Sequence, residues 1–515
     1  AMASAISANA AAGDLLADLA RRSLFTDRRD ATPPTYTFHA LFGEFLRARA
    51  AATLDAPALR ALRIRSAGIL AQAGQADAAV AQLIDASAWA EAFELICQHA
   101  GQMLAQGRIT LVRDWVLALP PLHGSTAQSQ YWLGCCELAV NPTKALQHLE
   151  LAHTGFEAAG DARGAFCAAC AAADAIIFQG DSLNTLVTWL PLMESYAPTY
   201  LSSRDVETDL RVLPGLLATF VYRETAHPLT PTLADLAERM LDQPLAASQR
   251  ILLGSLAYYF LWTGQRVRLD RILGKIDQMC AAPDVAAATL LRWYGITTVI
   301  LSLIGRIDDS NVCAQRALAL VRADAGLVGM TARAHLLVAL AALAARDAEL
   351  ARTHLNATAL VLDAGNAIDT TTYEYQRGLL MLLDRQWSDA ALLMRASVAS
   401  SQKSGWPMRE HIALLGLTLS CTQVGKFADA QAALQAMLGH RFYRVCRWHH
   451  WIGGLIEAHL ALRQNDLARC RVVLAAAFAT GREFGYDFGP MPYCCGDMMP
   501  QLASIALAYD IDRPF

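Results

Sequence analysis

Apolar runs of about ten residues, such as LLVALAALAA at Leu336–Ala345, follow one another along the chain and are separated by short polar or glycine-containing turns. One set of turns recurs at spacings of 41, 41, 39, 40 and 39 residues and is centred on Gly264, Gly305, Arg346, Arg385, Gly425 and Gln464. A second set lies between them, at Gly326, Gly365, Gly405 and Gly439. We therefore predict units of two helices of about 15 residues each, in which glycine supplies the left-handed residue that ends a helix.

The repeated unit resembles a tetratricopeptide helical hairpin, lengthened from about 34 to about 40 residues. Small residues follow the first set of turns, where two helices must approach closely, at Ala351, Ala390 and Ala430. Residues 139–161 and 178–190 fit the same frame, whereas residues 200–250 break the rhythm at Pro228 and Pro231. A stack of such hairpins curls into a superhelix with a concave face. The predicted fold class is therefore all-α, a tetratricopeptide-like α-solenoid.

The composition favours helices and excludes two classes of partner. Apolar residues make up 54% of the chain and charged residues 17%, with the helix formers Ala, Leu and Arg abundant. The net charge of −4 lacks the basic footprint of a nucleic-acid-binding protein. The apolar runs are half the roughly 20 residues that a membrane span needs, and the N-terminus lacks the pattern of a signal peptide. We expect a cytoplasmic protein that binds neither nucleic acid nor membrane.

Motifs for catalysis or metal binding are missing from the sequence. There is no GxxxxGK[ST] phosphate loop, no GxSxG elbow and no HExxH pair. The 12 cysteines indicate free thiols, and Cys167 and Cys170 are typical of small core residues one helical turn apart. The vicinal pairs at 135–136 and 494–495 leave redox activity open. We expect no enzyme activity, no metal site and no cofactor bound by this chain.

The segment DLLADLARRSLFTDRRDATPPTYTFHALFGEFLRARA, residues 14–50, carries a different pattern. It resembles the end of the winged-helix module in MalT-like, large ATP-binding LuxR-type regulators, which belong to the STAND class. In that family a helix leads to a basic pair before Leu-Phe, a short hairpin, and then Tyr-x-aromatic-His-x-Leu-Phe-x-x-Phe-Leu. The matching residues are Arg21, Arg22, Leu24, Phe25, Tyr36, Phe38, His39, Leu41, Phe42, Phe45 and Leu46, while a frequent second histidine of the family is Ala40 here.

The resemblance continues to about residue 121, through a segment that is a helical arm in the family. Its matching positions are Gly74, Ala78, Ala79, Trp89, Ala92, Leu95, Ile96, Leu104, Gly107, Arg108, Trp115, Leu119 and Pro120. From there to about residue 490 only the repeat period and the architecture are similar. The domains that we predict are a tag or linker (1–13), the end of a winged-helix module (14–50), a helical arm (51–125), a tetratricopeptide-like superhelical sensor domain (126–490) and a linker towards a DNA-binding domain (491–515).

The resemblance implies a role in transcription regulation. In MalT-like regulators the superhelix is taken to bind a small-molecule inducer or an inhibitory protein, which relieves autoinhibition and lets the ATP-loaded protein self-associate. We expect this chain to be the arm and inducer-sensing superhelix of such a regulator, with ATP bound by an NTPase module outside it. The alternative is a tetratricopeptide-type scaffold that binds a peptide or a regulatory protein.

The effector site is expected on the concave face, which the first helix of each hairpin should line. Concave pockets combine aromatic walls with a few polar groups, and arginine favours carboxylate or phosphate, so we expect an anionic or aromatic ligand. The candidates are Arg292, Trp293, Arg333, Tyr373, Tyr375, Arg377, Arg409, His411, Arg447, Trp448 and Trp451. Two interpretations stay open for them, because aromatics at helical spacing also form cores and arginines also extend to solvent. The adjacent histidines in WHHW at 448–451 point about 100° apart on a helix, which disfavours shared metal binding.

Overall fold

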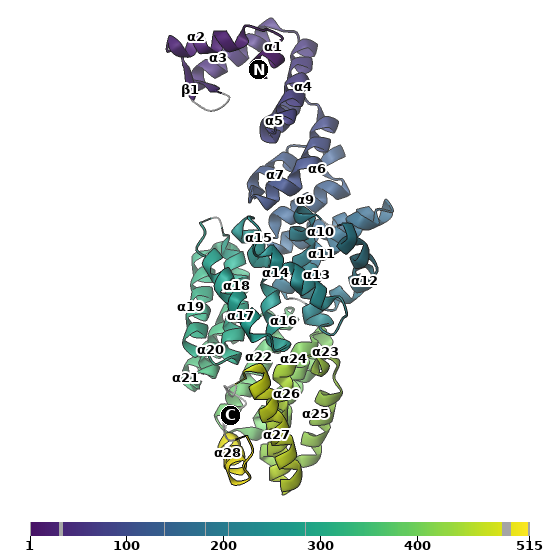
Figure 1. The fold of residues 1–515 in the computed structure, drawn as a ribbon, viewed down its shortest axis with the longest axis vertical. Helices are drawn as coiled ribbons and strands as arrows, with labels where there is room; N and C mark the ends of the chain where they lie inside the picture. The colour runs from purple at the N-terminus through teal and green to yellow at the C-terminus, as the bar shows by residue number, and fades with distance from the viewer. Residues whose placement is uncertain are drawn as a thin grey trace. The chain divides into compact units, whose positions relative to one another are not determined.

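The computed structural model describes residues 2–29, 34–138, 140–180, 182–203, 205–283, 285–486 and 496–512 (Figure 1). Over these residues the chain is largely α-helical, which confirms the all-α prediction. It forms two compact units, one made of residues 1–104 and 108–133 and the other of residues 105–107 and 134–515.

The first unit begins with two helices, a β-hairpin and a third helix. Their bounds are α1 (Met2–Ser7), α2 (Ala12–Arg21), β1 (Thr26–Arg29), β2 (Thr35–Phe38) and α3 (Ala40–Thr53). The strands are antiparallel, with Thr26 opposite Phe38 and Arg29 opposite Thr35. Further helices follow, namely α4 (Ala56–Gln72), α5 (Ala76–Asp85), α6 (Trp89–Ala105), α7 (Ile109–Leu117), α8 (Pro121–Gly124) and α9 (Ala127–Glu137).

Part of segment 1–13, which was predicted to be a tag or linker, is helical. Helix α1 occupies most of the first half of this segment, and α2 already begins at Ala12. A guanidinium nitrogen of Arg65 on α4 donates a hydrogen bond to the carbonyl of Ile6, with 3.1 Å between the two atoms. The segment is alanine-rich and therefore helix-forming, and its contact with α4 holds it in place.

The second unit consists of helices packed as antiparallel pairs. It begins with α10 (Pro142–Ala158), α11 (Ala162–Gln179), α12 (Thr185–Ser203), α13 (Val206–Arg223), α14 (Thr230–Met240), α15 (Ala247–Ile251), η1 (Leu252–Ser255), α16 (Leu256–Trp262) and α17 (Arg266–Met279). It continues with α18 (Ala287–Leu303), α19 (Ile307–Ala323), η2 (Ala325–Met330), α20 (Thr331–Ala344), α21 (Ala348–Val361), α22 (Ala367–Leu383) and α23 (Trp387–Ser404). The last elements are α24 (Pro407–Val424), α25 (Phe427–Gly439), η3 (Arg441–Arg444), α26 (Arg447–Arg463), α27 (Leu467–Phe484) and α28 (Met498–Ala508).

The helices of the repeats form two layers. Each of α18, α20, α22 and α24 packs against the helix that follows it in its own hairpin, and also against the first helix of the next hairpin. Helix α26 packs against α27 and against the single helix α28. Figure 1 shows successive hairpins stacked in this way, with α26 and α27 as the last complete pair. Ala351, Ala390 and Ala430, the small residues predicted at close approaches, are all fully buried. The helical-hairpin superhelix predicted from the spacing is thus present.

The first set of predicted turns is confirmed almost residue by residue. A left-handed backbone conformation occurs at Gly264, Gly305, Arg346, Arg385, Gly425 and Asn465. The last of these lies one residue after the predicted Gln464. Asparagine is among the few non-glycine residues that adopt this conformation readily, which explains the shift.

The second set of turns is built differently from the prediction. Only Gly405 has the left-handed conformation expected there, with a φ of 70°. The amides of Gly326 and Gly365 instead donate hydrogen bonds of 2.8 Å to the side chains of Asp324 and Asp363, and Gly439 is the last residue of α25. Aspartate side chains that bind the backbone two residues ahead make these turns without a left-handed residue.

Hydrogen bonds between residues far apart in the sequence join the early helices of the second unit to the late ones. In each of them the acceptor is a backbone carbonyl. The donor and acceptor residues are Leu183 and Ser404 (2.9 Å), Ile368 and Gly180 (3.1 Å), Asn184 and Lys403 (2.6 Å), and Arg223 and Gly405. We call this group of contacts the closure. It brings the α11–α12 connection against the starts of α22 and α24.

Two helical stretches, Ala162–Gln179 and Ala325–Ala344, are long and apolar enough to cross a membrane by length and composition alone. Their apolar windows are 72% and 61% buried inside the protein. A helix that is apolar on all sides belongs either to a protein core or to a membrane. Burial in the helix stack accounts for both stretches.

The C-terminal segment predicted as a linker contains a helix. Residues 487–495 and 513–515 lie outside the described part of the chain. The vicinal cysteines at 494–495 are therefore among the residues that the structure does not describe. Helix α28 packs against α26 and α27. The guanidinium of Arg471 lies 4.2 Å from the ring centre of Tyr509, and Arg482 pairs with Asp512. These contacts attach the segment to the last hairpin.

Candidate functional site

A cavity of about 190 Å³ lies inside the second unit, on the inner layer of helices. Seven helices and the residue that precedes α24 contribute to its wall. The lining residues are Ile177, Phe178, Tyr222, Tyr258, Trp262, Leu291, Arg292, Gly295, Ile296, Val299, Leu303, Arg333, Leu336, Leu337, Leu340, Ile368, Asp369, Thr372, Tyr375, Gln376, Trp406, Met408, Arg409 and Ile412.

One part of the wall is aromatic. The rings of Tyr222 and Tyr258 meet edge to face at a centroid distance of 5.7 Å, and Tyr258 stacks on Trp262 at 5.9 Å. Tyr375 and Trp406 complete this wall and are also buried. Burial raises the pKa of Tyr222 to about 12 and raises the pKa of Tyr258 well above its usual value. Both phenols are therefore neutral at physiological pH and keep a proton to donate.

A buried ion pair supports the cavity from α11 and α18. The Arg292 guanidinium donates two hydrogen bonds to the Asp174 carboxylate, one of them 2.6 Å long. The side chains are only 9% and 3% exposed. Burial lowers the pKa of Arg292, but the Asp174 carboxylate raises it by more, so that the pKa ends above its usual value. Two-point pairing of this kind fixes the orientation of both groups.

Arg333 links the cavity to the closure. Its Nε donates to Asp369 at 2.9 Å. Its other nitrogens donate to the carbonyls of Phe178 and Gln179, the latter at 2.9 Å. One side chain of α20 thereby holds the end of α11 and the start of α22 together.

Arg409 is the third arginine of the wall. Its guanidinium carbon lies 4.6 Å from the ring centre of Tyr375 and 4.7 Å from that of Trp406. Two of the three guanidiniums have a carboxylate partner among the described residues, since Arg292 pairs with Asp174 and Arg333 pairs with Asp369.

The structure brings four of the candidate residues together at this cavity, namely Arg292, Arg333, Tyr375 and Arg409. The other seven lie elsewhere. Trp293 is buried and packs against Gly254. The Arg377 guanidinium lies 5.5 Å from the ring centre of Tyr373, outside the cavity wall. Arg447 is exposed and lies over the ring of Phe484.

His411 and Trp448 belong to a buried cluster of rings beside the cavity, whereas the buried Trp451 stacks on Tyr486 with ring centres 5.6 Å apart. His411 stacks on His449 with ring centres 4.2 Å apart and an interplanar angle of 5°. Burial lowers the pKa of His411 to about 3 and lowers the pKa of His449 well below its usual value. The placement of Trp448 and Trp451 agrees with the interpretation that aromatics at helical spacing form the core. Among the residues that the structure describes, no group of three or more His, Cys, Asp or Glu side chains is arranged to hold a metal ion.

Several lining residues were missing from the sequence prediction. They are the aromatic residues of the early helices, the Trp406 ring, and the polar side chains Asp369 and Gln376. Asp174, the partner of the lining residue Arg292, was also missing. The run YYFLW at 258–262 offered an aromatic signal. No local pattern places α11, α13 and α16 opposite α22 and α24, because that neighbourhood arises from the closure.

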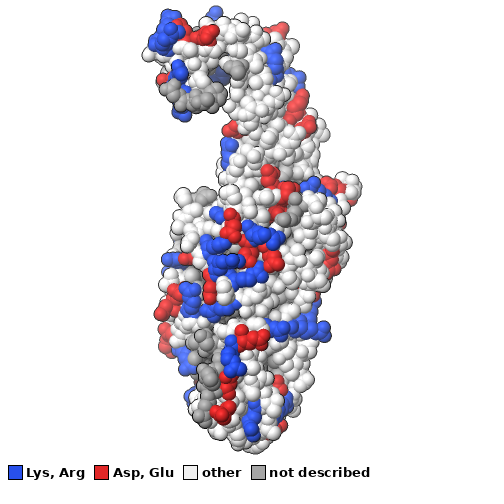
Figure 2. Space-filling view, in the orientation of Figure 1, with Lys and Arg blue, Asp and Glu red and all other residues white. Residues whose placement is uncertain are grey.

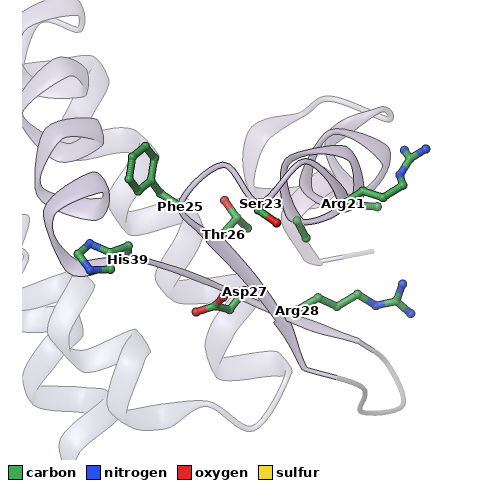
Figure 3. A pocket seen from close by; sticks show the side chains of 9 residues that line it. Arg21, Ser23, Phe25, Thr26, Asp27, Arg28 and His39 are labelled. Atoms are coloured by element: carbon green, nitrogen blue, oxygen red, sulfur yellow. The ribbon is translucent and has the colours of Figure 1, made fainter.

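A second hollow, of about 480 Å³, lies in the first unit between α2, β1 and the start of α3. Figure 3 shows that its labelled side chains do not converge, since Arg21 and Arg28 extend to one side, away from Phe25 and His39. Phe25 is 64% exposed. A ligand site needs polar groups that converge on one point, so this hollow is the weaker candidate.

Comparisons with known proteins identify the start of the chain. Residues 1–58 match the family model of the MalT winged helix domain, a range that includes α1, α2, the β-hairpin and α3. No curated protein matches the chain. Among solved structures, the chain is similar to one in the crystal structure of the APC/C hetero-tetramer Cut9–Hcn1, at a TM-score of 0.42 and 13% identity over 91% of this chain and 88% of that chain. The start of this chain is therefore similar to the MalT winged helix domain, and a tetratricopeptide-like superhelix follows it.

Proposed function

We propose that the second unit is the inducer-sensing domain of a cytoplasmic, ATP-dependent transcription activator of the LuxR-type STAND class. A small molecule binds in the cavity and relieves autoinhibition. The chain acts by binding and not by catalysis. ATP binds to an NTPase module, for which this sequence carries no phosphate loop.

The observation that carries the proposal is the position of the cavity next to the closure. Its wall includes Phe178 from the end of α11 and Ile368 from the start of α22, and both segments take part in closure contacts. A ligand that touches both sides stabilises the arrangement in which they are close. A ligand shifts a conformational equilibrium only by its differential affinity for the two states, and we expect contacts with both sides of the closure to produce that difference.

The size of the cavity favours a small molecule over the alternative of a peptide scaffold. Drug-sized ligands occupy pockets of roughly 300 to 1,000 Å³, and the cavity measures about 190 Å³. A peptide would need an open groove along several repeats. On the face seen in Figure 2, positive and negative side chains interleave and form no track of one sign for a charged peptide.

The test is a thermal-shift screen of the chain against several hundred metabolites, with calorimetry on the hits. A ligand at a hundred times its dissociation constant adds about 2.7 kcal/mol to the stability of the native state. That increment raises the unfolding midpoint by a few degrees, so we expect a selective shift from one chemical class. A panel without any shift, together with a protein partner recovered from the source cells that binds the second unit, would establish the scaffold instead.

A further inference from the structure

The cavity also indicates the chemical class of its ligand. We propose that it takes a neutral monocyclic aromatic compound with one carbonyl group, whose ring lies against the aromatic wall and whose carbonyl oxygen accepts a hydrogen bond from Tyr222 or Tyr258. The inference rests on the proposed function, because it names the ligand class of the same site. Four properties of the cavity carry it, namely its volume, its apolar wall, the pairing of its charges and two tyrosine hydroxyl groups.

The volume sets the size of the ligand. An apolar cavity of about 150 Å³ in another protein binds benzene. The cavity here, at about 190 Å³, has room for one ring and one small substituent. An oligosaccharide or a nucleotide exceeds this space.

The wall favours an aromatic body. Most of the lining residues are aliphatic or aromatic, and Leu291, Leu337 and Ile412 share the space with the aromatic wall. Ring pairs in offset or edge-to-face contact gain energy beyond the burial of their area. A sugar ring would bring several hydroxyl groups, each of which needs a partner once it is buried.

The charged groups of the wall already have partners within the protein, which favours a neutral ligand. Arg292 pairs with Asp174 and Arg333 with Asp369, and the guanidinium of Arg409 lies over two rings of the aromatic wall. A charged ligand would lose its hydration against groups that the protein already engages, and burying such a charge is costly. The sequence led us to expect an anionic or an aromatic ligand, and this arrangement favours the aromatic one.

Two hydroxyl groups in the wall remain for the ligand. Tyr222 and Tyr258 line the cavity, and among the described residues neither hydroxyl forms a hydrogen bond. Neither oxygen is fully enclosed by protein atoms, so each keeps some surface open to the cavity. A hydroxyl group that is removed from water without a partner is costly, and a ligand that supplies an acceptor regains that cost.

The charges near the two hydroxyl groups place them beside the other polar residues of the cavity. Arg292 and Arg333 act on the pKa of Tyr222, and Arg409 acts on the pKa of Tyr258. All three arginines line the cavity. Burial raises the pKa of both phenols, so each hydroxyl keeps its proton and donates it to an acceptor such as a carbonyl oxygen.

The first experiment compares three probes that share one ring and differ in charge: the neutral acetophenone, the anion benzoate and the cation of benzylamine. Calorimetry on the whole chain should show binding of acetophenone at least about tenfold tighter than binding of either ion, because the ions must be buried without a free partner of opposite charge. Benzoate or benzylamine that binds as tightly as acetophenone would overturn the proposal.

The second experiment tests the two hydroxyl groups with ethylbenzene, which has the same ring and lacks the carbonyl oxygen. The double change Tyr222→Phe with Tyr258→Phe removes both hydroxyl groups and keeps the rings. It should weaken acetophenone binding several-fold, in line with the loss of a hydrogen bond, and leave ethylbenzene binding unchanged. Tyr373→Phe, a change on α22 outside the cavity wall, should alter neither affinity. Unchanged acetophenone binding in the double variant, or equal weakening of both ligands, would overturn the proposal.

A pair of glycine variants tests the location of the ligand independently of its polar contacts. A methyl group on Gly295, which lines the cavity, would meet only Leu337, at an ordinary 3.7 Å, and a methyl group on Gly274 of α17 would meet nothing within 4 Å. Both Gly→Ala changes should raise the melting temperature slightly, because alanine favours the helix interior. Only Gly295→Ala should weaken acetophenone binding, by several-fold. Unchanged binding in Gly295→Ala would place the ligand elsewhere and overturn the proposal.

The failure of this inference differs from the failure of the proposed function. Stabilisation by sugars, nucleotides, acids or amines but not by acetophenone overturns the ligand class and leaves the sensor function standing. The absence of stabilisation by any compound of the wider panel overturns both.

Discussion

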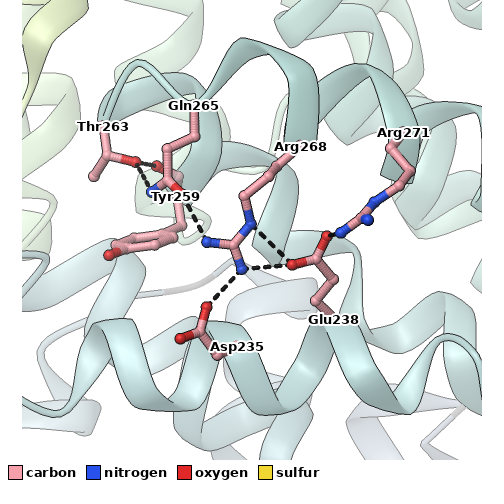
Figure 4. A network of polar contacts seen from close by, with 7 residues as sticks. All are labelled: Asp235, Glu238, Tyr259, Thr263, Gln265, Arg268 and Arg271. Carbon is pink, nitrogen blue, oxygen red and sulfur yellow. Dashed lines mark hydrogen bonds and ion pairs between the residues drawn. The ribbon is translucent and has the colours of Figure 1, made fainter.

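Two groups of arginine contacts in the second unit, made of ion pairs and hydrogen bonds, differ in the distance along the chain that they connect. On α14 and α17 the Arg268 guanidinium lies between Asp235 and Glu238, which are 33 and 30 residues away, and Arg271 shares Glu238 with it (Figure 4). At the cavity, Arg292 pairs with Asp174 across 118 residues, and Arg333 reaches the Gln179 carbonyl across 154. The first group joins neighbouring helices of the stack, and the second joins parts of the superhelix that only its curvature brings together.

The two groups also differ in exposure. Asp235 and Arg271 are about half exposed, at 53% and 54%, and Figure 2 shows basic and acidic side chains gathered on this face. The carboxylate of Asp174 is 3% exposed. Contacts between neighbours are the usual source of stability in a solenoid. The long-range pairs add a constraint that a plain stack of repeats lacks, and the cavity forms where they meet.

The largest expected effect comes from removing one partner of the buried pair. Asp174→Ala leaves the Arg292 guanidinium buried without its carboxylate, which should destabilise the protein by about 3–5 kcal/mol. Urea unfolding followed by circular dichroism measures this. If the single variant does not fold, the double change Asp174→Leu with Arg292→Met should restore a folded chain, because an apolar pair of similar volume avoids the unpaired charge. If Asp174→Ala is as stable as the unchanged protein, the ion pair of Asp174 and Arg292 does not stabilise the fold.

A smaller effect is expected from two helix-ending glycines that differ only in their surroundings. A methyl group on Gly405 would collide with Asn184 and Arg223 of the closure, whereas one on Gly425 would meet nothing within 4 Å. Both have a positive φ, of 70° and 81°. Gly425→Ala should cost about 1–2 kcal/mol for the left-handed conformation alone, and Gly405→Ala about 1–3 kcal/mol more for the collision. If thermal unfolding shows the same loss of stability for Gly405→Ala and Gly425→Ala, the contacts of the closure around Gly405 do not contribute to stability.

Acid should weaken the ring cluster beside the cavity. His411 and His449 stay neutral in the folded protein because their pKa values lie far below the ordinary value, with His440 and His450 also nearby. The unfolded chain binds protons at these positions below about pH 6.5, so stability falls as the pH drops from there towards 3. At pH 5 one such histidine accounts for a loss of about 2 kcal/mol. In His449→Phe, the free energies of unfolding at pH 5 and pH 8 should differ by about 2 kcal/mol less than they do in the unchanged protein. An unchanged difference would show that the buried neutral histidine does not cause the loss of stability in acid.

The smallest effect is expected at an exposed pair between adjacent hairpins. Arg395 and Asp429 lie 3.2 Å apart, and both side chains are about half exposed. Exposed pairs contribute about 0–1 kcal/mol and are screened by salt. Asp429→Asn should therefore lower stability by less than about 1 kcal/mol, with even less change at 1 M salt. A loss as large as that of Asp174→Ala would remove the distinction between exposed pairs of neighbouring hairpins and the buried long-range pair.

The sequence predicted those features that depend on contacts between neighbours. The turn spacing located the left-handed residues of the first set to within one position, and Ala351 and its counterparts were placed at close approaches. Among the candidate site residues, those at the cavity lie on the first helices of the hairpins, as expected. Each of these features repeats at about 40 residues, so a single sequence displays it several times.

The features that the sequence did not predict occur only once among the described residues, and they depend on the curvature of the superhelix. Tyr222, Tyr258 and Asp174 belong to the site only because the closure brings early helices opposite late ones. The superhelical pitch that achieves this is the sum of small rotations between repeats, and no motif encodes it. Trp448 and Trp451 were candidates because of their residue types, and the structure buries both of them, Trp448 in the ring cluster and Trp451 against Tyr486.

The most direct test of the account is hydrogen exchange at two amides of the closure. The amide of Leu183 donates to Ser404 and that of Ile368 to Gly180, and neither bond lies within a helix, so both report closure opening. Exchange is measured by NMR or mass spectrometry, with and without a saturating cavity ligand. The account predicts that the ligand slows exchange at these amides and leaves the amides of α25 unchanged. Slower exchange everywhere except at the closure, or no change at either amide in the presence of bound ligand, would contradict the coupling of cavity and closure.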